Sequence, residues 1–239
     1  AEDGIRDIGV TGVQTCALPI WNPVDLDVFH PPETRSTRSR LRILYTGRIH
    51  PEKGLHLLVE AWTLLRHEGV EADLRLLGPS SRADGGGGEE YVRRLRSLAG
   101  DAEIELPGSV ADPAVLADEL RDADIYCYPS IADRGEASPV APLEAMACGL
   151  APVVADLPQY AAYIQHERSG LVFERGPGEA RRLAGALGRL AGESAFRREL
   201  VDGAIESARG YGLDAIADAY LTDFQASIDA LAASRGSSP

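Results

Sequence analysis

The stretch LRILYTGRIHPEKGLHLLVEAWTLLRHEG, residues 41–69, decides the fold. Its first six residues, Leu41 to Thr46, form a largely apolar run that ends at a glycine, which is typical of a buried β-strand. From Leu55 to Leu65 apolar residues recur at helical spacing, and Gly69 ends the predicted helix. A strand that leads through a short loop into a helix is the repeating unit of a parallel α/β sheet.

The same alternation continues through the rest of the chain. It predicts further strands over residues 73–77, 103–106, 125–128, 151–155 and 170–173, and further helices over residues 89–99, 112–122, 158–164, 179–191, 195–208 and 213–233. We therefore expect residues 41–233 to form one α/β domain with a doubly wound, parallel, Rossmann-like sheet and C-terminal helices. The four glycines at 85–88 are expected to form a flexible loop tip rather than a phosphate-binding loop.

Ligands of doubly wound sheets bind beside the carboxyl ends of the strands. The predicted strands are followed by loops that hold Gly47, Gly78, Gly108, Ser130 and Glu136. We therefore expect these loops to lie together at one edge of the sheet.

The loop GRIHPEKG, residues 47–54, carries the first candidate site. Gly47 allows the backbone to approach a ligand closely. Arg48 can grip a diphosphate with its guanidinium fork, and Lys53 can add a compact positive charge. Lys53 is the single lysine among 24 lysines and arginines, which hints at a site that requires an ammonium group. The alternative is that both residues are ordinary surface cations near the start of a helix.

The stretch GEASPVAPLEAMACG, residues 135–149, carries the second candidate site. Prolines inside this stretch make a continuous helix from Glu136 unfavourable, whereas Pro142 suits the first turn of a helix and Gly149 suits its end. We therefore expect Glu136 on a loop and Glu144 in the first turn of a short helix. A helix start suits a phosphate, and two carboxylates beside it suit sugar hydroxyls. The alternative is that Glu144 only favours the dipole of its own helix.

The composition excludes several classes of function. A net charge of −13 argues against nonspecific nucleic-acid binding, which requires a basic face. Cys16, Cys127 and Cys148 lack metal-binding spacing and the five histidines form no ligand cluster, so we expect no metal site and a reducing compartment. No apolar run approaches the roughly 18 residues of a transmembrane helix. With 44% hydrophobic residues, the chain can build a sizeable core.

Residues 1–21 fit poorly with the remainder of the chain. Back-translation of residues 1–7 and 10–20 gives a sequence that resembles an indexed short-read sequencing adapter, with Ile8 and Gly9 as the index. We interpret residues 1–21 as a non-native leader, with a natural N-terminal segment as the alternative, and expect that the 5′ part of the gene is missing. Residues 22–40 are interpreted as an interdomain linker, and residues 234–239 as a frayed tail.

Motifs in order along residues 22–220 resemble the donor-binding, C-terminal half of a retaining GT-B glycosyltransferase of family 4. The motifs are Asn22-Pro-Val-Asp25 with Phe29, the Gly-Arg and Lys-Gly ends of loop 47–54, Leu-Leu-Gly78, Leu-Pro-Gly108-Ser-Val, Ala-Asp124-Ile, Pro-Ser130, Glu136-x7-Glu144 and Ser-Gly170-Leu-Val-Phe. Each motif alone is weak evidence for the resemblance, whereas the order and spacing of all the motifs together are strong evidence.

The resemblance implies a role for each candidate residue. Arg48 and Lys53 would hold the donor diphosphate, Glu136 would bind donor-sugar hydroxyls, and Glu144 would bind the ribose. Further backbone contacts are implied as well: a close approach at Gly47, phosphate contacts at Val140 and Ala141, and a flank for the base at Gly108, Ser109 and Val110. The donor would be a nucleotide-diphosphate sugar, with UDP or GDP as its nucleotide, and neither a metal nor a cofactor is expected.

The resemblance also implies partners that this chain does not itself supply. The acceptor would be a sugar or a lipid-linked glycan held by a missing N-terminal domain, in bacterial polysaccharide, glycolipid or glycoconjugate synthesis. The location would be cytoplasmic, with peripheral attachment to the inner membrane face as an option. This chain alone is therefore expected to bind donor weakly, if at all, and to transfer nothing.

Three positions depart from the family pattern. Pro23 replaces a glycine of the linker motif, Ser138-Pro139 replaces Phe-Gly, and Leu157-Pro158-Gln159 stands where two glycines are common. Pro139 has no N–H and so cannot bind a phosphate there. Two other functions remain open: a noncatalytic Rossmann-like nucleotide-binding module, and a sugar-nucleotide epimerase, against which the Glu136–Glu144 pattern speaks.

Overall fold

The computed structural model describes residues 22–34, 38–132 and 139–236. Its centre is a six-stranded sheet in the order β3-β2-β1-β4-β5-β6, in which every pair of neighbours is parallel. The strands are β1 (Leu41–Thr46), β2 (Ala72–Leu77), β3 (Ile104–Gly108), β4 (Ile125–Tyr128), β5 (Pro152–Ala155) and β6 (Leu171–Phe173). The predicted doubly wound, parallel sheet is confirmed. Its order reverses between β1 and β4, which is where such sheets bind ligands.

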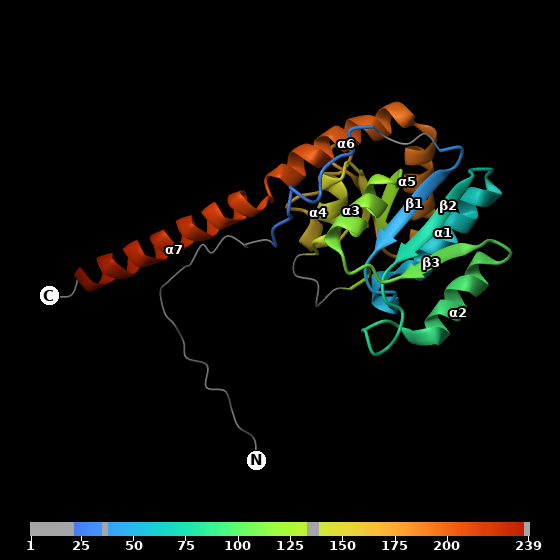
Figure 1. The fold of residues 1–239 in the computed structure, drawn as a ribbon, viewed down its shortest axis with the longest axis horizontal. Coiled ribbons are helices and arrows are strands. Elements are labelled where there is room, and N and C mark those ends of the chain that lie inside the picture. The colour runs from blue at the N-terminus through green and yellow to red at the C-terminus, as the bar shows by residue number, and fades with distance from the viewer. Residues whose placement is uncertain (1–21, 35–37, 133–138, 237–239) are drawn as a thin grey trace, which may run out of the picture.

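Helices cover both faces of the sheet (Figure 1). They are α1 (Leu55–His67), α2 (Gly88–Ala99), α3 (Pro113–Arg121), α4 (Ala141–Ala147), α5 (Glu179–Gly192), α6 (Ser194–Arg209) and α7 (Leu213–Gly236), with the 3-10 turns η1 (Pro51–Lys53) and η2 (Pro158–Tyr160). Helix α1 packs against α2 and α5, whereas α4 packs against α3 and α6.

Burial explains why the predicted elements form. Strands β4 and β5 are buried along their whole length, as expected for parallel strands covered on both faces. On α1, the apolar stripe faces the sheet, and Trp62 is 2% exposed. Its indole N–H donates to the Ala72 carbonyl at 2.7 Å, which ties α1 to the start of β2.

The predicted helix over residues 158–164 is wrong. The chain forms the short 3-10 turn η2 and then further turns up to Tyr163. The Tyr163 N–H bonds to the Tyr160 carbonyl three residues earlier, at 3.1 Å. Both tyrosine rings are buried, 1% exposed each. Three residues per turn places residues three apart on one side, so tight winding buries both rings together.

Part of the predicted linker packs onto the domain. Val24 is 1% exposed and Phe29 is 5% exposed, and the Val24 N–H donates to the Tyr211 carbonyl at 2.8 Å. Residue 24 also forms an isolated bridge with Gly212, directly before α7. The first described residues and the α6–α7 junction are therefore held together.

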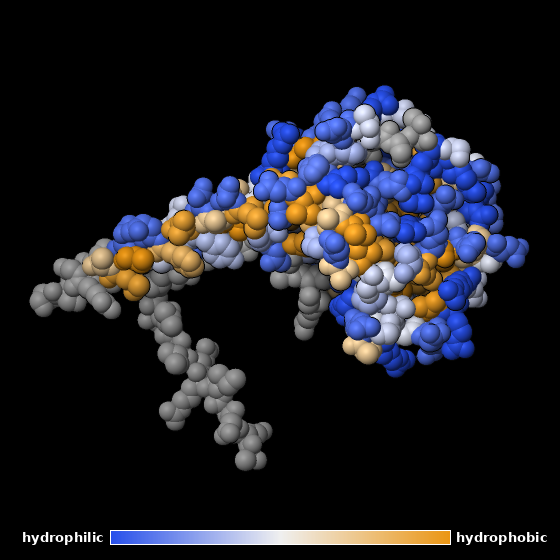
Figure 2. Space-filling model, viewed as in Figure 1, coloured by the Kyte–Doolittle hydropathy of each residue, from blue (hydrophilic) through white to orange (hydrophobic). Residues whose placement is uncertain are grey.

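Helix α7 extends from the body as a long rod (Figure 1). Six of its large apolar side chains are 39–66% exposed, and apolar patches appear in orange along the rod in Figure 2; the six are Leu213, Tyr220, Leu221, Phe224, Ile228 and Leu231. Within the described part of the chain, no helix has the length and apolar character needed to cross a membrane.

Candidate functional site

The loop between β1 and α1 follows a path that requires glycine at both ends. Gly47 has φ +137°, and a Cβ there would lie 2.7 Å from the Tyr45 hydroxyl. Gly54 has φ +66°, and a Cβ there would lie 2.1 Å from the Pro129 carbonyl oxygen. At these distances a Cβ would clash with its neighbours, so only glycine fits at either position. The loop therefore lies tightly on β1 and on the end of β4.

Hydrogen bonds join this loop to the segment that follows β4. The Glu52 carbonyl accepts from the Ile131 N–H at 2.9 Å and from the Ser130 hydroxyl at 3.3 Å. Ser130 is completely buried. Loop 47–54 is thus fixed to Ser130 and Ile131, directly after the end of β4.

Lys53 is buried beneath the loop rather than extended into solvent. Its side chain is 7% exposed, and Nζ lies 3.8 Å from Glu52 Oε1 and 5.7 Å from the centre of the Tyr128 ring. Burial lowers the pKa of Lys53, the Glu52 carboxylate opposes that effect, and Arg48 adds to it. A single ammonium is therefore held in a position with little water around it.

Arg48 lies on the outer side of the same loop. Its Nη2 donates to Glu52 Oε1 at 2.5 Å, and its Nη1 donates to the Gly85 carbonyl at 3.0 Å. The side chain is 46% exposed. Glu52 thus contacts both cations that the sequence predicted to clamp a diphosphate, which brings Arg48 and Lys53 together.

The expectation of a free glycine tip at residues 85–88 is wrong. Gly86 and Gly88 are buried, and the Gly87 N–H donates to the Ile49 carbonyl at 2.8 Å. A Cβ on Gly86 would lie 2.3 Å from the Ser80 carbonyl carbon. The glycines let this loop pack closely against loop 47–54, where the Gly85 carbonyl orients Arg48.

A pocket of about 280 Å³ opens at the carboxyl ends of β1, β2 and β3, beside the start of α4. Six predicted site residues line it, namely Gly47, Arg48, Ser109, Val110, Ala141 and Glu144. Its other lining residues are Thr46, Leu77, Gly78, Pro79 and Leu116. The expectation that the loops after β1, β2 and β3 meet at one edge is therefore confirmed. The pocket combines apolar walls with polar and charged groups.

The remaining predicted residues lie beside the pocket or outside the described chain. Gly108 ends β3, and its carbonyl accepts from the Gly78 N–H at 2.9 Å. Val140 caps α4, and Lys53 lies under loop 47–54. Glu136 falls within residues 133–138, which lie outside the described residues, as do residues 1–21.

Glu144 is placed in the first turn of α4, as predicted. Pro142 occupies the first turn, and Gly149 follows the end of the helix with φ +81°. Burial raises the pKa of Glu144 to about 7. The first N–H groups of α4 have no partner within the helix, so the helix start and the carboxylate offer donors and acceptors side by side.

Sequence analysis missed two kinds of residue at this site. Thr46 and Leu116 line the pocket, and the tyrosines Tyr45 and Tyr128 lie beneath the two cations. Thr46 could have been found because it directly precedes Gly47 at the strand end. The tyrosines carry no such signal, because in a buried strand an aromatic residue is indistinguishable from ordinary core.

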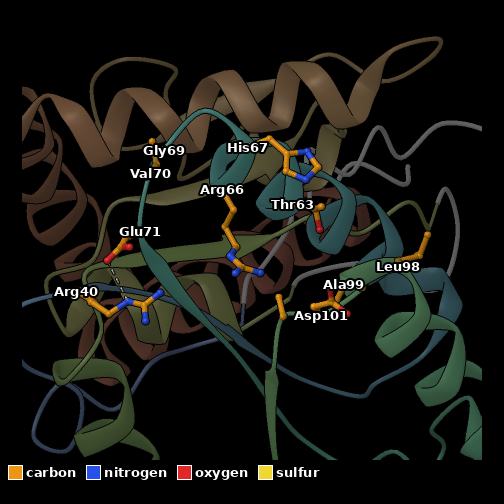
Figure 3. A pocket seen from close by; sticks show the side chains of 12 residues that line it. Arg40, Thr63, Arg66, His67, Gly69, Val70, Glu71, Leu98, Ala99 and Asp101 are labelled. Carbon is orange, nitrogen blue, oxygen red and sulfur yellow. Dashed lines mark ion pairs between the residues drawn. The ribbon is translucent and has the colours of Figure 1, made fainter.

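A second, larger hollow of about 550 Å³ lies at the opposite edge of the sheet (Figure 3). It opens between the C-terminal ends of α1 and α2, beside Arg40 at the start of β1. Arg40 pairs with Glu71 at 3.8 Å and with Asp73 at 3.5 Å, and the Arg66 guanidinium lies 5.1 Å from the Trp62 ring. Arg40 and Arg66 thus already have partners within the chain. None of the predicted site residues lines this hollow.

The described residues contain no group of three or more His, Cys, Asp or Glu side chains that could hold a metal ion. Cys127 and Cys148 are buried free thiols, and burial raises the pKa of Cys127.

Comparison with known proteins places the chain in a family. Residues 40–193 match the family described as glycosyl transferases group 1. A D-inositol 3-phosphate glycosyltransferase of Kineococcus radiotolerans is 30% identical over 233 residues, covering 90% of this chain and 53% of that protein. The chain spans about half the length of the D-inositol 3-phosphate glycosyltransferases that it matches.

Solved structures share the fold. Sucrose-phosphate synthase from Thermosynechococcus elongatus superimposes with a TM-score of 0.73 at 26% identity, over 90% of this chain and 52% of that one. Anabaena HepE (Alr3699), in complex with UDP and glucose, gives a TM-score of 0.66 at 18% identity, over 89% and 56%. With its Rossmann-like sheet and its family match over residues 40–193, the chain belongs to the group 1 glycosyltransferases and shares the fold of GT-B neighbours.

Proposed function

We propose that the pocket between β1, β3 and α4 binds the nucleoside diphosphate of a UDP- or GDP-sugar for retaining transfer of a hexosyl group. The observation that carries this proposal is the convergence of six predicted residues on one pocket at the point where the strand order reverses. The bound UDP and glucose of Anabaena HepE, which shares the fold, support it.

The pocket's composition suggests how the nucleotide lies in it. Val110 and Leu116 line an apolar wall beside Ser109, which suits a flat base. The Glu144 carboxylate would accept hydrogen bonds from ribose hydroxyls, and the N–H groups of Val140 and Ala141 would contact a phosphate. Arg48 and Lys53 would bind the remaining diphosphate charge.

Transfer would depend on charge stabilisation. The bond between the anomeric carbon and the diphosphate oxygen breaks, and the diphosphate leaves with that electron pair. An acceptor hydroxyl passes its proton to the departing diphosphate oxygen, and its oxygen bonds to the anomeric carbon on the same face. Arg48 and Lys53 are fixed before reaction and would stabilise the negative charge that develops on the leaving group. These two side chains would supply the positive charge that a metal ion supplies in other enzymes. Glu136 would orient the donor sugar by binding its hydroxyls.

The acceptor side of the reaction belongs to the proposal as well. The 239 residues correspond to about half of the relatives' length, so we expect them to bind donor weakly and to transfer nothing by themselves. The acceptor would be a sugar or lipid-linked glycan bound by a further domain in the cytoplasm, in polysaccharide or glycoconjugate synthesis.

Calorimetric titration of the chain with UDP, GDP and ADP tests this function. We expect saturable binding of one nucleotide, weakened at least about tenfold by Lys53→Ala and by Glu144→Ala, since each loses a charged contact. Arg66→Ala, in the hollow at the opposite edge, is the matched control and should leave binding unchanged. Absence of binding, or binding that neither substitution weakens, would contradict the proposal.

A further inference from the structure

We propose that Tyr45 and Tyr128 form a stacked pair that positions both cations of the diphosphate site, Tyr128 acting on Lys53 and Tyr45 acting on Arg48. The inference rests on the proposed nucleoside diphosphate binding and names the residues that prepare the site for it. Neither tyrosine would touch the ligand, so both are positioning residues.

Tyr128 supports Lys53 through its ring. The Lys53 Nζ lies over the ring, 5.7 Å from its centre, within the distance at which an ammonium is attracted to an aromatic face. Tyr128 is 5% exposed and the Lys53 side chain 7%, so little water weakens the attraction. A ring face stabilises the ammonium without neutralising it, which leaves its full charge for a diphosphate.

Tyr45 supports Arg48 through its hydroxyl. The Tyr45 O–H donates to the Arg48 carbonyl at 2.9 Å, and a Cβ on Gly47 would lie only 2.7 Å from the same hydroxyl. The backbone of residues 47 and 48 therefore lies directly on this hydroxyl. Because the backbone at Arg48 is fixed there, the guanidinium has fewer orientations to lose when it binds a ligand.

The two supports are coupled because the rings are stacked. The centres of Tyr45 and Tyr128 lie 5.6 Å apart, with 22° between the ring planes. Tyr128 also makes a T-shaped contact with Tyr160, with 6.3 Å between the ring centres. Tyr45 comes from β1 and Tyr128 from β4, so the pair spans the place where the strand order reverses, beneath the loop that carries both cations.

Substitutions that keep the two positions filled with apolar side chains separate the two roles from simple packing. Leucine at 128 offers no aromatic face to the ammonium, and phenylalanine at 45 leaves the Arg48 carbonyl without its donor. Phenylalanine at 128, in contrast, retains the ring face. The proposal therefore predicts that removal of the hydroxyl weakens diphosphate binding at position 45 and leaves it unchanged at position 128.

The experiment compares the dissociation constant of a nucleoside with that of its diphosphate, using uridine and UDP or guanosine and GDP. The nucleoside reaches neither cation. The dissociation constant of the nucleoside divided by that of its diphosphate therefore measures what Arg48 and Lys53 contribute to binding of the diphosphate. We expect Tyr128→Leu to lower this ratio about tenfold and Tyr45→Phe about threefold to tenfold, whereas Tyr128→Phe keeps it. The ring contacts continue from Tyr160 to Tyr163 and from Tyr163 to Tyr211. The matched control, Tyr211→Leu, removes the ring at the far end of this row and should keep the ratio.

A series of rings at position 128 distinguishes electronic support from packing. Phenylalanine and its mono-, di- and trifluorinated forms have nearly the same shape and a progressively weaker negative face. We expect the diphosphate constant to weaken stepwise along the series while the nucleoside constant stays level. This series also decides the matter if Tyr128→Leu does not fold.

The outcomes separate this inference from the proposed function. If the unmodified chain binds the diphosphate and Lys53→Ala abolishes its advantage, but the fluorinated series is flat and Tyr45→Phe changes nothing, the tyrosine roles are overturned and the proposed function stands. If the unmodified chain does not prefer the diphosphate to the nucleoside, the proposed function fails and the inference fails with it.

Discussion

At the scale of single residues, Glu52 holds the candidate clamp together in the absence of a ligand. Its carboxylate lies 2.5 Å from Arg48 Nη2, 3.8 Å from Lys53 Nζ and 3.4 Å from His50 Nδ1. Partly exposed ion pairs of this kind contribute about 0–1 kcal/mol, so a diphosphate with two or more charges can displace or share them at low cost. Glu52 thus keeps two like charges close together until a stronger anion arrives.

Glu144 gives a pH-dependent prediction. Burial raises its folded-state pKa to about 7 from 4.5, so between these values the folded protein binds more protons than the unfolded chain. Stability from this group is therefore present below pH 4.5 and is lost as the pH rises through about 7. We expect Glu144→Gln, which cannot ionise, to gain about 1–2 kcal/mol relative to the unmodified protein between pH 5 and pH 8.

Urea denaturation of both proteins across this pH range measures the difference. Glu193→Gln, at an exposed residue directly after α5, is the matched control for the loss of a surface carboxylate. A difference that stays constant with pH would mean that Glu144 is ionised in the folded protein at no cost.

Of the six predicted residues that line the pocket, Gly47, Arg48 and Glu144 were indicated by their residue types at strand and helix ends. Ser109, Val110 and Ala141 were indicated only by the resemblance to a family, because their types carry no such signal. The sequence could not indicate that Lys53 is buried or that Tyr45 and Tyr128 lie beneath the clamp, because both facts depend on the pairing of β1 with β4, which are about 80 residues apart.

At the scale of elements, glycine and proline determined which boundaries could be predicted. Helix α4 ends where Gly149 adopts φ +81°, and Asp112 caps α3 by accepting the Ala114 N–H at 2.9 Å. The predicted helix at 158–164 failed because two buried tyrosines three residues apart favour tighter winding. Loop 85–88 was misread because its glycines serve close packing against loop 47–54, and composition alone does not separate that use from flexibility.

Gly54 provides the test at this scale. It joins η1 to α1 with φ +66°, and a Cβ there would lie 2.1 Å from the Pro129 carbonyl oxygen. We expect Gly54→Ala to lower the free energy of unfolding by more than about 2 kcal/mol, because positive φ and a backbone clash add. It should also separate the Glu52 carbonyl from Ile131 and weaken nucleotide binding.

Gly185→Ala is the matched substitution. Gly185 lies inside α5, and a Cβ there would have no neighbouring atom within 4 Å, so alanine should raise stability by about 0.5–1 kcal/mol. Urea denaturation and calorimetry compare the two variants. Equal effects of both would show that loop 47–54 is not held against the end of β4.

At the scale of the whole molecule, the sheet with its covering helices and the rod of α7 differ in what stabilises them. The core is continuous from Val24 to Ala208, and Ile216 is 7% exposed where α7 leaves the body. Beyond that point the described large apolar side chains of α7 are at least 39% exposed. Tyr220 and Phe224 contact each other, 6.0 Å between ring centres. The outer part of α7 therefore contributes little to the free energy of folding.

This difference predicts that substitution of an apolar residue by glutamine affects stability on α6 and has little effect on the outer part of α7. Leu221→Gln and Ile228→Gln, at residues 66% and 59% exposed, should leave the thermal midpoint within about 2 °C, because surface changes alter stability by less than about 0.5 kcal/mol. Leu200→Gln, at a residue 1% exposed on α6, should cost more than about 3 kcal/mol by burying an amide in the core. Differential scanning calorimetry of the three variants measures this. If the α7 variants unfold as early as the α6 variant, α7 is packed against the body in solution, and its apolar stripe already has its partner within the chain.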